Sequence, residues 1–223
     1  MYLPSHFQQN DPAELQGLMQ RYPFATLVTL QDGQPNADSV PMIFDADTQV
    51  LRGHVARANP LWRKARGQPV LALFQGPQAY VSPSWYATKA LTHKVVPTWN
   101  YCVVQAQGVL QVVDDGPWLQ ALVTDLTLRH ESGRPAPWAV ADAPADYVQQ
   151  MLRAIVGIRI DVTQLQGKWK VSQNRDAADR AGVVCGLRAD AARRRAEAVA
   201  NDLADSADDL ADRVAATGHP QPP

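Results

Sequence analysis

The sequence of 223 residues has little cysteine, no long apolar run and no excess of charge of either sign. Its two cysteines, Cys102 and Cys185, are far apart and form no Cys-x-x-Cys pair, which indicates neither a disulfide framework nor a thiolate metal site. No apolar stretch approaches the ~18 residues of a transmembrane helix, and the first residues do not resemble a signal peptide. The formal net charge of -1 provides no positive field for nucleic acid. The composition therefore predicts a soluble, cytoplasmic protein.

The short motifs of several catalytic and binding classes are also missing. No Gly-x-Ser-x-Gly elbow surrounds Ser82, Ser84 or Ser172, and no His/Cys cluster has the spacing of metal ligands. No Gly-x-Gly-x-x-Gly turn indicates a dinucleotide fold, and no basic recognition helix indicates direct reading of DNA. Redox chemistry in this chain would therefore come from a dissociable cofactor, and no catalytic side chain is predicted.

Apolar periodicity predicts a mainly β protein with flanking helices. Helices are predicted over residues 11–21, 59–67, 117–130 and 145–153, and strands over residues 24–30, 36–44, 49–53, 69–75, 79–81, 101–113 and 155–162. Asp11 and Asp115 are predicted to begin helices, Asp32-Gly33 to form a hairpin turn, and Gly108 to form a bulge. Residues 69–75 are almost continuously apolar, so this strand is predicted to be buried on both faces. Roughly seven such strands indicate a closed or partly closed antiparallel β-barrel.

The composition changes abruptly after about Leu187, where Ala, Asp and Arg predominate. We predict one domain over residues 1–187, followed over residues 188–223 by a long amphipathic helix and a Pro-rich tail. The apolar positions of this helix are Val199, Leu203, Leu210 and Val214. Two interpretations remain open, a solvated helix along its own barrel and a helix packed on a partner subunit. Acidic residues outnumber the arginines around Arg193–Arg195, which disfavours DNA contact there.

The segment Gly53–Pro60, Gly-His-Val-Ala-Arg-Ala-Asn-Pro, is the densest candidate site. It follows a β-like run, and small residues flank its arginine, so backbone amides and a guanidinium can approach one anion together. We predict that His54, Ala56 and Arg57 face a phosphate. A histidine beside a strand end is also commonly a structural residue, and Asn59 before a proline suits the cap of the next helix.

Two aromatic segments add surfaces that suit a flat ring. In the first, Trp85 lies beside Tyr86 and is followed by Lys89, and two adjacent aromatic residues rarely share one core. At least one of them is therefore expected to face a groove or a partner. The second segment contains Thr98, Trp99, Asn100 and Tyr101, and an amide between aromatic rings can pair with the edge of a heterocycle. The structural alternative for this asparagine is support of the turn at Pro97.

A fourth segment places Lys168 and Lys170 on either side of Trp169, after the last predicted strand. Two lysines around an aromatic ring suit a phosphate or the polar edge of a ring, although a charge pair at a strand end is usually only solvated. Taken with the other three segments, the pattern predicts a site for flavin mononucleotide (FMN) on a small barrel.

Several long motifs, spread over residues 1–187, resemble those of a known protein family. They are Met1-Tyr-Leu-Pro4 with His6-Phe7, Gly53–Pro60 with Leu61-Trp62, Phe74-Gln-Gly-Pro77 with Ala79-Tyr80, Val96–Tyr101, Ile155-Val-Gly157 and Gly167–Asn174. In these motifs the chain resembles the PaiB-type family, described as FMN-binding negative transcriptional regulators. The resemblance implies a split β-barrel, as in pyridoxamine-phosphate-oxidase-like proteins, and a bacterial homodimer with FMN in a groove shared by both subunits.

The resemblance also implies roles for the candidate residues. His54, Ala56 and Arg57 would face the phosphate, Thr98 to Tyr101 would line the ring or the ribityl chain, and Lys168 to Lys170 would reach the site from the carboxyl end. The chain departs from the family at Ser39 and Gln78, where relatives commonly carry histidines. A haem, metal or acid–base role at those two positions is therefore not expected.

Three hypotheses about function follow. The first is a homodimeric FMN-dependent oxidoreductase that takes electrons from a nicotinamide cofactor. The second is a negative transcriptional regulator without enzymatic activity, in which direct contact with DNA has no support from charge or motif. The third is a barrel that binds another ligand, such as haem. The site residues favour the first hypothesis, and the description of the family favours the second.

Overall fold

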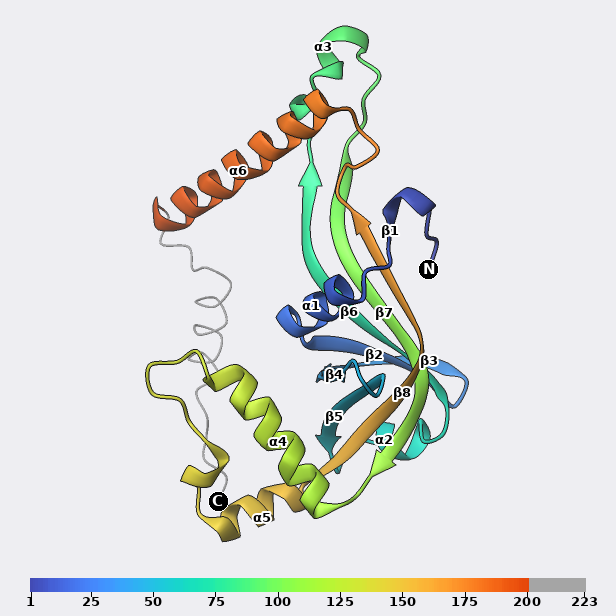
Figure 1. Cartoon of the computed structure of the whole chain (residues 1–223), viewed down its shortest axis with the longest axis vertical. Helices are drawn as coiled ribbons and strands as arrows, with labels where there is room; N and C mark the ends of the chain where they lie inside the picture. Colours follow the sequence, from blue (N-terminus) through green and yellow to red (C-terminus); the bar gives the residue numbers. More distant parts are fainter. Residues whose placement is uncertain (201–223) are drawn as a thin grey trace. The chain divides into compact units, whose positions relative to one another are not determined.

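The computed structural model describes residues 1–200, and Figure 1 labels its elements. The chain divides into two compact units. The first unit comprises Met1–Gln78 and Tyr101–Val171, and the second comprises Ala79–Asn100 and, of the described residues, 172–200. Each unit has an apolar cluster of its own.

Strands predominate in the first unit and helices in the second. The strands are β1 (Gln8–Gln9), β2 (Phe24–Gln31), β3 (Gln34–Pro41), β4 (Ile43–Asp45), β5 (Val50–Ala56), β6 (Pro69–Val81), β7 (Thr98–Val113) and β8 (Ile155–Lys170). The α-helices are α1 (Pro12–Arg21), α2 (Leu61–Lys64), α3 (Thr88–Thr92), α4 (Gly116–Glu131), α5 (Ala145–Arg153) and α6 (Ala177–Ala200). Short 3-10 turns are η1 (Ser5–Phe7), η2 (Pro83–Trp85) and η3 (Val140–Asp142).

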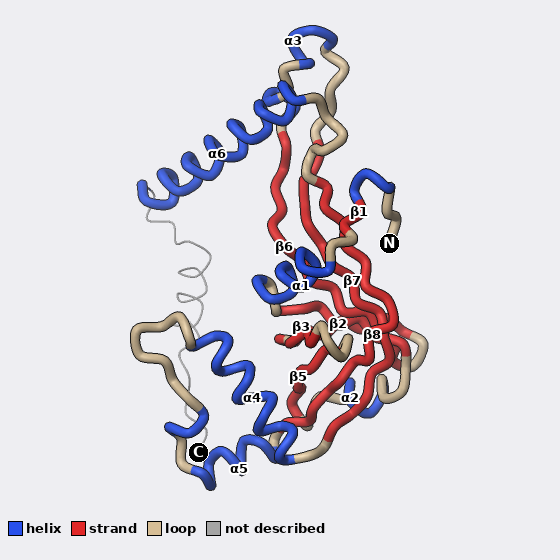
Figure 2. The backbone as a smooth tube through the Cα atoms, viewed as in Figure 1, coloured by secondary structure: helices blue, strands red, loops and turns tan. Residues whose placement is uncertain are grey.

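The strands form one 8-stranded antiparallel sheet, drawn red in Figure 2. Its order is β3-β2-β6-β7-β8-β5-β4, and β1 pairs with β8 outside this path. The edge strand β3 also contacts β5, where a Cβ added to the buried Gly53 would lie 3.0 Å from the carbonyl oxygen of Pro41. The sheet therefore curls upon itself without a continuous ladder of hydrogen bonds between β3 and β5. This is a split β-barrel with flanking helices, and the predicted fold class is confirmed.

Local sequence signals set several element boundaries as predicted. The carboxylate of Asp11 accepts a hydrogen bond from Ala13 N (2.9 Å) at the start of α1, and that of Asp115 accepts one from Trp118 N (2.8 Å) at the start of α4. Asp32 and Gly33 have φ of 53° and 76°, which the two-residue hairpin between β2 and β3 requires. Gly108 lies at the bulge between β7 and β8, where a Cβ would overlap the backbone of β8.

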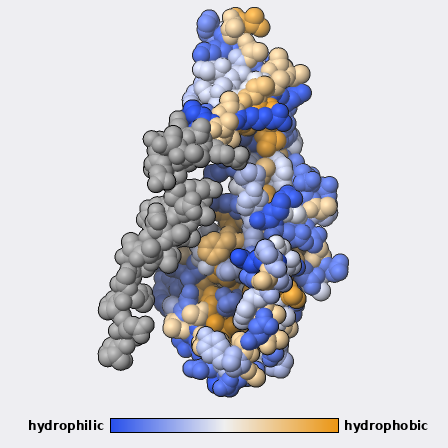
Figure 3. Space-filling model, turned by 90° about the vertical axis from the view of Figure 1, so that its left-hand side faces the viewer, coloured by the Kyte–Doolittle hydropathy of each residue, from blue (hydrophilic) through white to orange (hydrophobic). Residues whose placement is uncertain are grey.

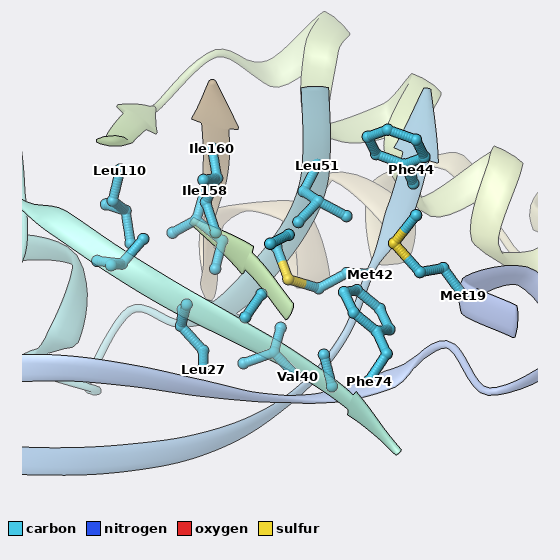
Figure 4. Close-up of a cluster of buried hydrophobic side chains, with 14 of the residues drawn as sticks. Met19, Leu27, Val40, Met42, Phe44, Leu51, Phe74, Leu110, Ile158 and Ile160 are labelled. Carbon is cyan, nitrogen blue, oxygen red and sulfur yellow. The ribbon is translucent and has the colours of Figure 1, made fainter. Parts of the chain in front are cut away.

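One apolar cluster fills the inside of the curled sheet. Figure 4 shows its largest side chains converging from several strands and from α1, namely Met19, Leu27, Val40, Met42, Phe44, Leu51, Phe74, Leu110, Ile158 and Ile160. Full burial of one such side chain contributes about 1.5–3 kcal/mol. The cluster therefore dominates the stability of the first unit.

The strand β6 is buried on one face, which corrects the prediction of burial on both faces. Val70, Ala72 and Phe74 belong to the core cluster, whereas Pro69 and Gln75 are exposed. Leucines at the intervening positions are only half-buried. The reason is that the outer face of an antiparallel sheet is free to meet solvent, so an apolar run does not require a second covering layer.

The helix α4 covers the outer face of β5 and β8 (Figure 1). Its Leu122 and Leu126 are buried against Ile43 of β4, and Trp118 packs beside them. Gly157 of β8 leaves the space that the Trp118 ring occupies. An ion pair of 3.0 Å between Arg52 of β5 and Asp125 of α4 adds a polar contact to the same face.

Several strands are longer than their sequence patterns predicted: β6 joins the predicted strands 69–75 and 79–81, and β7 begins at Thr98 instead of residue 101. The extensions of β5 and β8 affect the candidate site. β5 continues to Ala56 instead of ending at Gly53, and β8 continues to Lys170 instead of ending at Val162. Partner strands stabilise both extensions, because Ala56 pairs with Ile155, and Lys170 pairs with Tyr101. The candidate residues His54, Ala56, Lys168 and Lys170 are therefore strand residues rather than loop residues.

The second unit is built around the contact of α6 with the η2–α3 segment. Val81, Tyr86 and Val183 are buried together. The indole of Trp85 lies against Gly186 of α6, and the backbone carbonyl of Trp85 lies against Gly182. The helix begins at Ala177, earlier than the predicted Leu187. The apolar positions predicted for this helix, from Val199 onward, lie outside the residues whose side chains are described. The domain boundary at residue 187 stays a prediction.

Exposed apolar side chains are scattered over both units. Phe24 and Leu91 are 66% and 83% exposed, and Figure 3 shows orange areas separated by blue ones on one face of the molecule. Single exposed apolar side chains are common in folded proteins. Within residues 1–200, no helix is long and apolar enough to cross a membrane.

The close packing of Trp85 on α6 predicts a large effect of a single methyl group. In Gly182→Ala the new Cβ would overlap the backbone of Trp85, so we expect a loss of about 1–3 kcal/mol through overpacking. In the matched control Gly17→Ala, the Cβ would lie 3.4 Å from the flexible side chain of Arg21, and better helix propensity should stabilise α1. Denaturant unfolding followed by tryptophan fluorescence measures both, and equal stability of the two variants would contradict the packing argument.

Candidate functional site

The predicted site residues fall into two sets. His54, Ala56, Arg57, Tyr101, Lys168 and Lys170 lie in the first unit, and Trp85, Lys89, Thr98, Trp99 and Asn100 lie in the second. Within the first unit the structure separates them again. His54 and Ala56 lie at the end of β5 and Arg57 follows it, whereas Tyr101, Lys168 and Lys170 lie on β7 and β8. Each group is built differently.

His54 lies on the outer face of β5. The side chains of Leu51 and Val55 belong to the core cluster, and Arg52 two residues before His54 pairs with α4. Strand alternation places His54 on the same face as Arg52, towards α4. Its Nδ1 is buried and has no hydrogen-bond partner among the described residues, and burial lowers the pKa of the imidazole below 6.5. His54 is therefore neutral at pH 7, which makes it a weak partner for a phosphate.

Arg57 is held by the protein itself. Its guanidinium binds both carboxylate oxygens of Asp114, at 2.8 and 2.6 Å, and donates to the carbonyl oxygens of Arg153 (2.7 Å) and Ile155 (3.0 Å). These bonds use all but one of the N–H donors of an arginine side chain. They tie the end of β5 to the end of β7 and to the start of β8. A phosphate contact of Arg57 stays a prediction, and it would compete with Asp114.

The residues around Arg57 have structural roles as well. Asn59 Oδ1 accepts a hydrogen bond from Leu61 N (2.8 Å) at the start of α2, as predicted, and Asn59 Nδ2 donates to Asp38 (2.8 Å). The indole of Trp62 donates to the carbonyl oxygen of Arg57 (3.0 Å). Ala56 is exposed at the end of its strand. The segment Gly53–Pro60 is thus a firmly bonded connection between β5 and α2.

Tyr101, Lys168 and Lys170 share one face of the β7–β8 pair. The register pairs Tyr101 with Lys170 and Val103 with Lys168, and strand alternation puts these side chains on one side of the sheet. Cys102 and Trp169 occupy the opposite side and pack against the core cluster. The structure therefore brings these three predicted residues together.

Lys168 is the most unusual charged residue of the first unit. It is only 8% exposed, and its Nζ donates to the carbonyl oxygen of Tyr2 at 3.0 Å. The rings of Tyr2 and Tyr101 lie 5.6 and 5.4 Å from the same nitrogen, within the range of cation–π contacts. Among the described residues, no carboxylate pairs with this ammonium. The sequence predicted Lys168 but missed Tyr2, although Tyr2 belongs to one of the quoted motifs.

In the second unit, several candidates have contacts within the unit, and that of Asn100 is with Ser172 rather than with the turn at Pro97. Asn100 is 9% exposed, and its amide exchanges hydrogen bonds with the hydroxyl of Ser172 at 2.9 and 3.3 Å. Trp85 packs on α6, and Lys89 Nζ donates to Ser84 Oγ at 3.1 Å. These contacts give the three side chains roles within the unit itself.

Trp99 differs from these residues because it is exposed. Its ring meets that of Tyr80 edge to face, with centroids 6.2 Å apart and an interplanar angle of 74°. Trp99 is 54% exposed and Tyr80 is 41% exposed. An open aromatic pair of this kind can stack on a flat ring. Ring-lining roles of Thr98 and Trp99 stay predictions.

Residues 1–164 match the family described as a putative FMN-binding domain. The chain belongs to this family. It is 33% identical over 187 residues to the protease synthase and sporulation protein PAI 2 of Bacillus subtilis, which covers 82% of this chain and 87% of that protein. An uncharacterised protein of Emericella nidulans is 33% identical over 226 residues, with 84% and 90% covered. The predicted membership of the PaiB-type family is confirmed, and FMN, the predicted cofactor, is the one in the family description.

Two solved structures share the fold. The FAD and heme binding protein from Mycobacterium smegmatis has a TM-score of 0.59 at 19% identity, with 78% of each chain covered. The flavocytochrome Anf3 from Azotobacter vinelandii has a TM-score of 0.57 at 13% identity, with 78% of this chain and 75% of that chain covered. At these identities the likeness supports the split-barrel fold alone. Relatives in both bacteria and fungi leave the predicted bacterial origin a prediction.

The bonds between Arg57 and Asp114 predict a pH-dependent contribution to stability. Hydrogen bonds from Arg57 hold the pKa of Asp114 below its ordinary value of 3.8. The stabilisation is therefore complete above pH 3.8 and is lost as the pH falls through the lower pKa of the folded state. Asp114→Asn should lower the thermal unfolding midpoint at pH 7, and the difference from the unmodified protein should shrink in acid.

Asp161→Asn is the control, because Asp161 also pairs with an arginine at the surface, Arg159. It removes the same charge but leaves Arg57 bonded, so its effect at pH 7 should be smaller. Thermal unfolding followed by circular dichroism between pH 3 and pH 7 measures both variants. An equal effect of the two substitutions would contradict a special role of Asp114.

Proposed function

We propose that this chain binds FMN through Lys168 and uses the bound flavin for oxidoreductase chemistry. The observation that carries the proposal is a lysine ammonium that is 8% exposed and bonded to a neutral carbonyl. The family description supports the identity of the cofactor. Lys168 is proposed to bind an anionic oxygen of the ligand, and the phosphate of FMN is the group that supplies one at neutral pH.

The physical argument concerns the cost of burying a charge. An ammonium removed from water is destabilising unless opposite charge or hydrogen-bond acceptors surround it. Lys168 has three N–H donors, of which one binds Tyr2 O and two have no hydrogen-bond partner among the described residues. The tyrosine rings compensate only in part. A phosphate would supply both the missing charge and the missing acceptors.

Comparison with the other predicted phosphate ligands favours Lys168. Arg57 already binds a carboxylate, and His54 is neutral at pH 7. Tyr101 and Lys170 share the face of Lys168, so they are proposed to contact the same ligand. When bound, FMN supplies hydride or one-electron transfer, whereas these side chains bind and orient it.

Three further parts of the proposal rest on membership of the family rather than on contacts in the structure. They are a homodimer, a nicotinamide cofactor as the reductant and a cytoplasmic location. The regulatory alternative is supported only by the description of the PaiB-type family as negative transcriptional regulators. A net charge of -1 does not favour direct contact of the protein with DNA. The haem alternative is weakened by Ser39 and Gln78, since the resemblance to the family would place histidines at these two positions.

Replacing Lys168 should weaken FMN binding more than replacing another lysine. Lys168→Met removes one charge-assisted contact, so we expect the Kd for FMN to rise by about one to two orders of magnitude. The control Lys64→Met removes the same charge at the surface, where Lys64 pairs with Asp32, and should leave the Kd unchanged. Quenching of flavin fluorescence on titration measures both.

The same titration separates Lys168 from Arg57. If Arg57→Ala weakens binding and Lys168→Met does not, the phosphate belongs to the end of β5 and this proposal for Lys168 is wrong. If neither the parent protein nor any variant quenches flavin fluorescence, the proposal that this chain binds FMN is wrong.

A further inference from the structure

The first residues of the chain are fastened to Lys168 at two points. The backbone of Gln8 in β1 pairs with Lys168 in β8, opposite the side where Val103 of β7 pairs with it. The chain before β1 then turns back, through a bond of 2.9 Å from Phe7 N to Pro4 O in η1. The turn brings the carbonyl oxygen of Tyr2 within 3.0 Å of Lys168 Nζ. Lys168 thus binds both ends of the segment Tyr2–Gln8, Gln8 by strand pairing and Tyr2 through the lysine side chain.

The two ends differ in how firmly they are held. Near β1, Phe7 is 9% exposed, and backbone hydrogen bonds between strands fix the chain. At the outer end, Tyr2 is 83% exposed, so packing contributes little to its position. What holds Tyr2 is one hydrogen bond to the ammonium and a cation–π contact with its own ring. The outer end can therefore separate while the inner end stays in place.

Tyr2 also lies where a ligand would have to enter. Lys168 is almost fully buried, whereas the residue bonded to its ammonium is almost fully exposed. Tyr101, the other aromatic neighbour of the ammonium, belongs to the long strand β7 and is fixed by its pairing with Lys170. Of the two residues, Tyr2 is the one whose backbone belongs to no strand, so it can move away from Lys168 without breaking a strand pair.

We propose that Met1–His6 is a ligand-responsive cover of the Lys168 site. An anionic oxygen that reaches Lys168 replaces the carbonyl oxygen of Tyr2, and the segment separates from the sheet as far as Phe7, whose buried side chain stays in place. This inference rests on the proposed function, because it uses the same lysine. Its ligand class is an anion with a phosphate group, and FMN and free phosphate are two sources of that group.

The replacement follows from the strengths of the two bonds. A hydrogen bond from an ammonium to a charged oxygen is roughly twice as strong as one between neutral groups, and a phosphate offers several charged oxygens. The carbonyl of Tyr2 carries no net charge and cannot neutralise the ammonium. Competition between them therefore favours the anion, and it leaves Tyr2 without its principal contact.

The experiment compares release of the segment with binding of the ligand. Release is measured as the hydrogen–deuterium exchange rate of the Phe7 amide, whose bond to Pro4 O closes the turn, read by NMR on the full chain. FMN, riboflavin and inorganic phosphate are the probes, and flavin fluorescence reports binding separately. FMN should raise the exchange rate by about tenfold, as expected for loss of one hydrogen bond to a charged group. Riboflavin, which lacks the phosphate, should not.

Variants show whether Lys168 carries the effect. Lys168→Met should raise Phe7 exchange without any ligand, and FMN should then add nothing. Tyr2→Gly leaves the lysine intact but removes one ring, so it should raise exchange by less. Lys64→Met is the matched control and should behave like the parent protein. Spectra of the amides of β2 and β3 report whether each variant is folded.

The outcomes distinguish the two proposals. If FMN binds but Phe7 exchange is unchanged, the cover is wrong and the proposed function stands. If FMN does not bind but millimolar phosphate raises the exchange rate, the cover stands and the proposed function fails. An equal rise of Phe7 exchange with riboflavin and FMN would overturn the replacement of Tyr2 by an anion. If no probe binds and none changes Phe7 exchange, both proposals are wrong.

Discussion

Strand β8 carries the ladders on which the first unit depends. It pairs with β7 along almost its whole length, with β5 through its first half and with β1 near its end. This one element fills the core with Ile158 and Ile160 and presents Lys168 on the other face, although regular alternation would put residues 158, 160 and 168 on one face. The bulge opposite Gly108 leaves one residue of β8 unpaired and thereby exchanges the two faces between these regions. Core and candidate site are therefore parts of one ladder, and a shift of one residue would misplace both.

The fold could be predicted where a signal is local. Asp11, Asp115 and the Asp32-Gly33 turn act on neighbouring backbone groups, so their sequence context is sufficient. The lengths of β5 and β8 could not be predicted in this way. The run Thr163–Gln166 has polar residues that resemble the end of a strand, yet β7 supplies hydrogen-bond partners for it. Whether a polar run continues a strand depends on a neighbour that is distant in sequence.

In the candidate site, too, the partners of side chains are distant in sequence and could not be predicted from local signals. Residue type identified Arg57 and Lys168 as donors for an anion, but it did not reveal which of them is already engaged. The partner of Arg57 is Asp114, 57 residues away, and that of Lys168 is the carbonyl of Tyr2, 166 residues away. A backbone carbonyl leaves no mark on the sequence, so the contact of Tyr2 could be found only in the structure. The resemblance in the first residues was the one signal that pointed there.

Arg57 and Lys168 carry the same formal charge in opposite circumstances. Arg57 lies at the surface, bound by a carboxylate and two carbonyls, so an incoming anion meets an already neutralised pair. Lys168 is buried, and its hydrogen-bond partner has no charge, so an anion would complete its surroundings. A net charge of -1 therefore says little about anion binding by this chain. The deciding quantity is how far the donors of each cation are already satisfied, and by that measure the end of β8 is the stronger site.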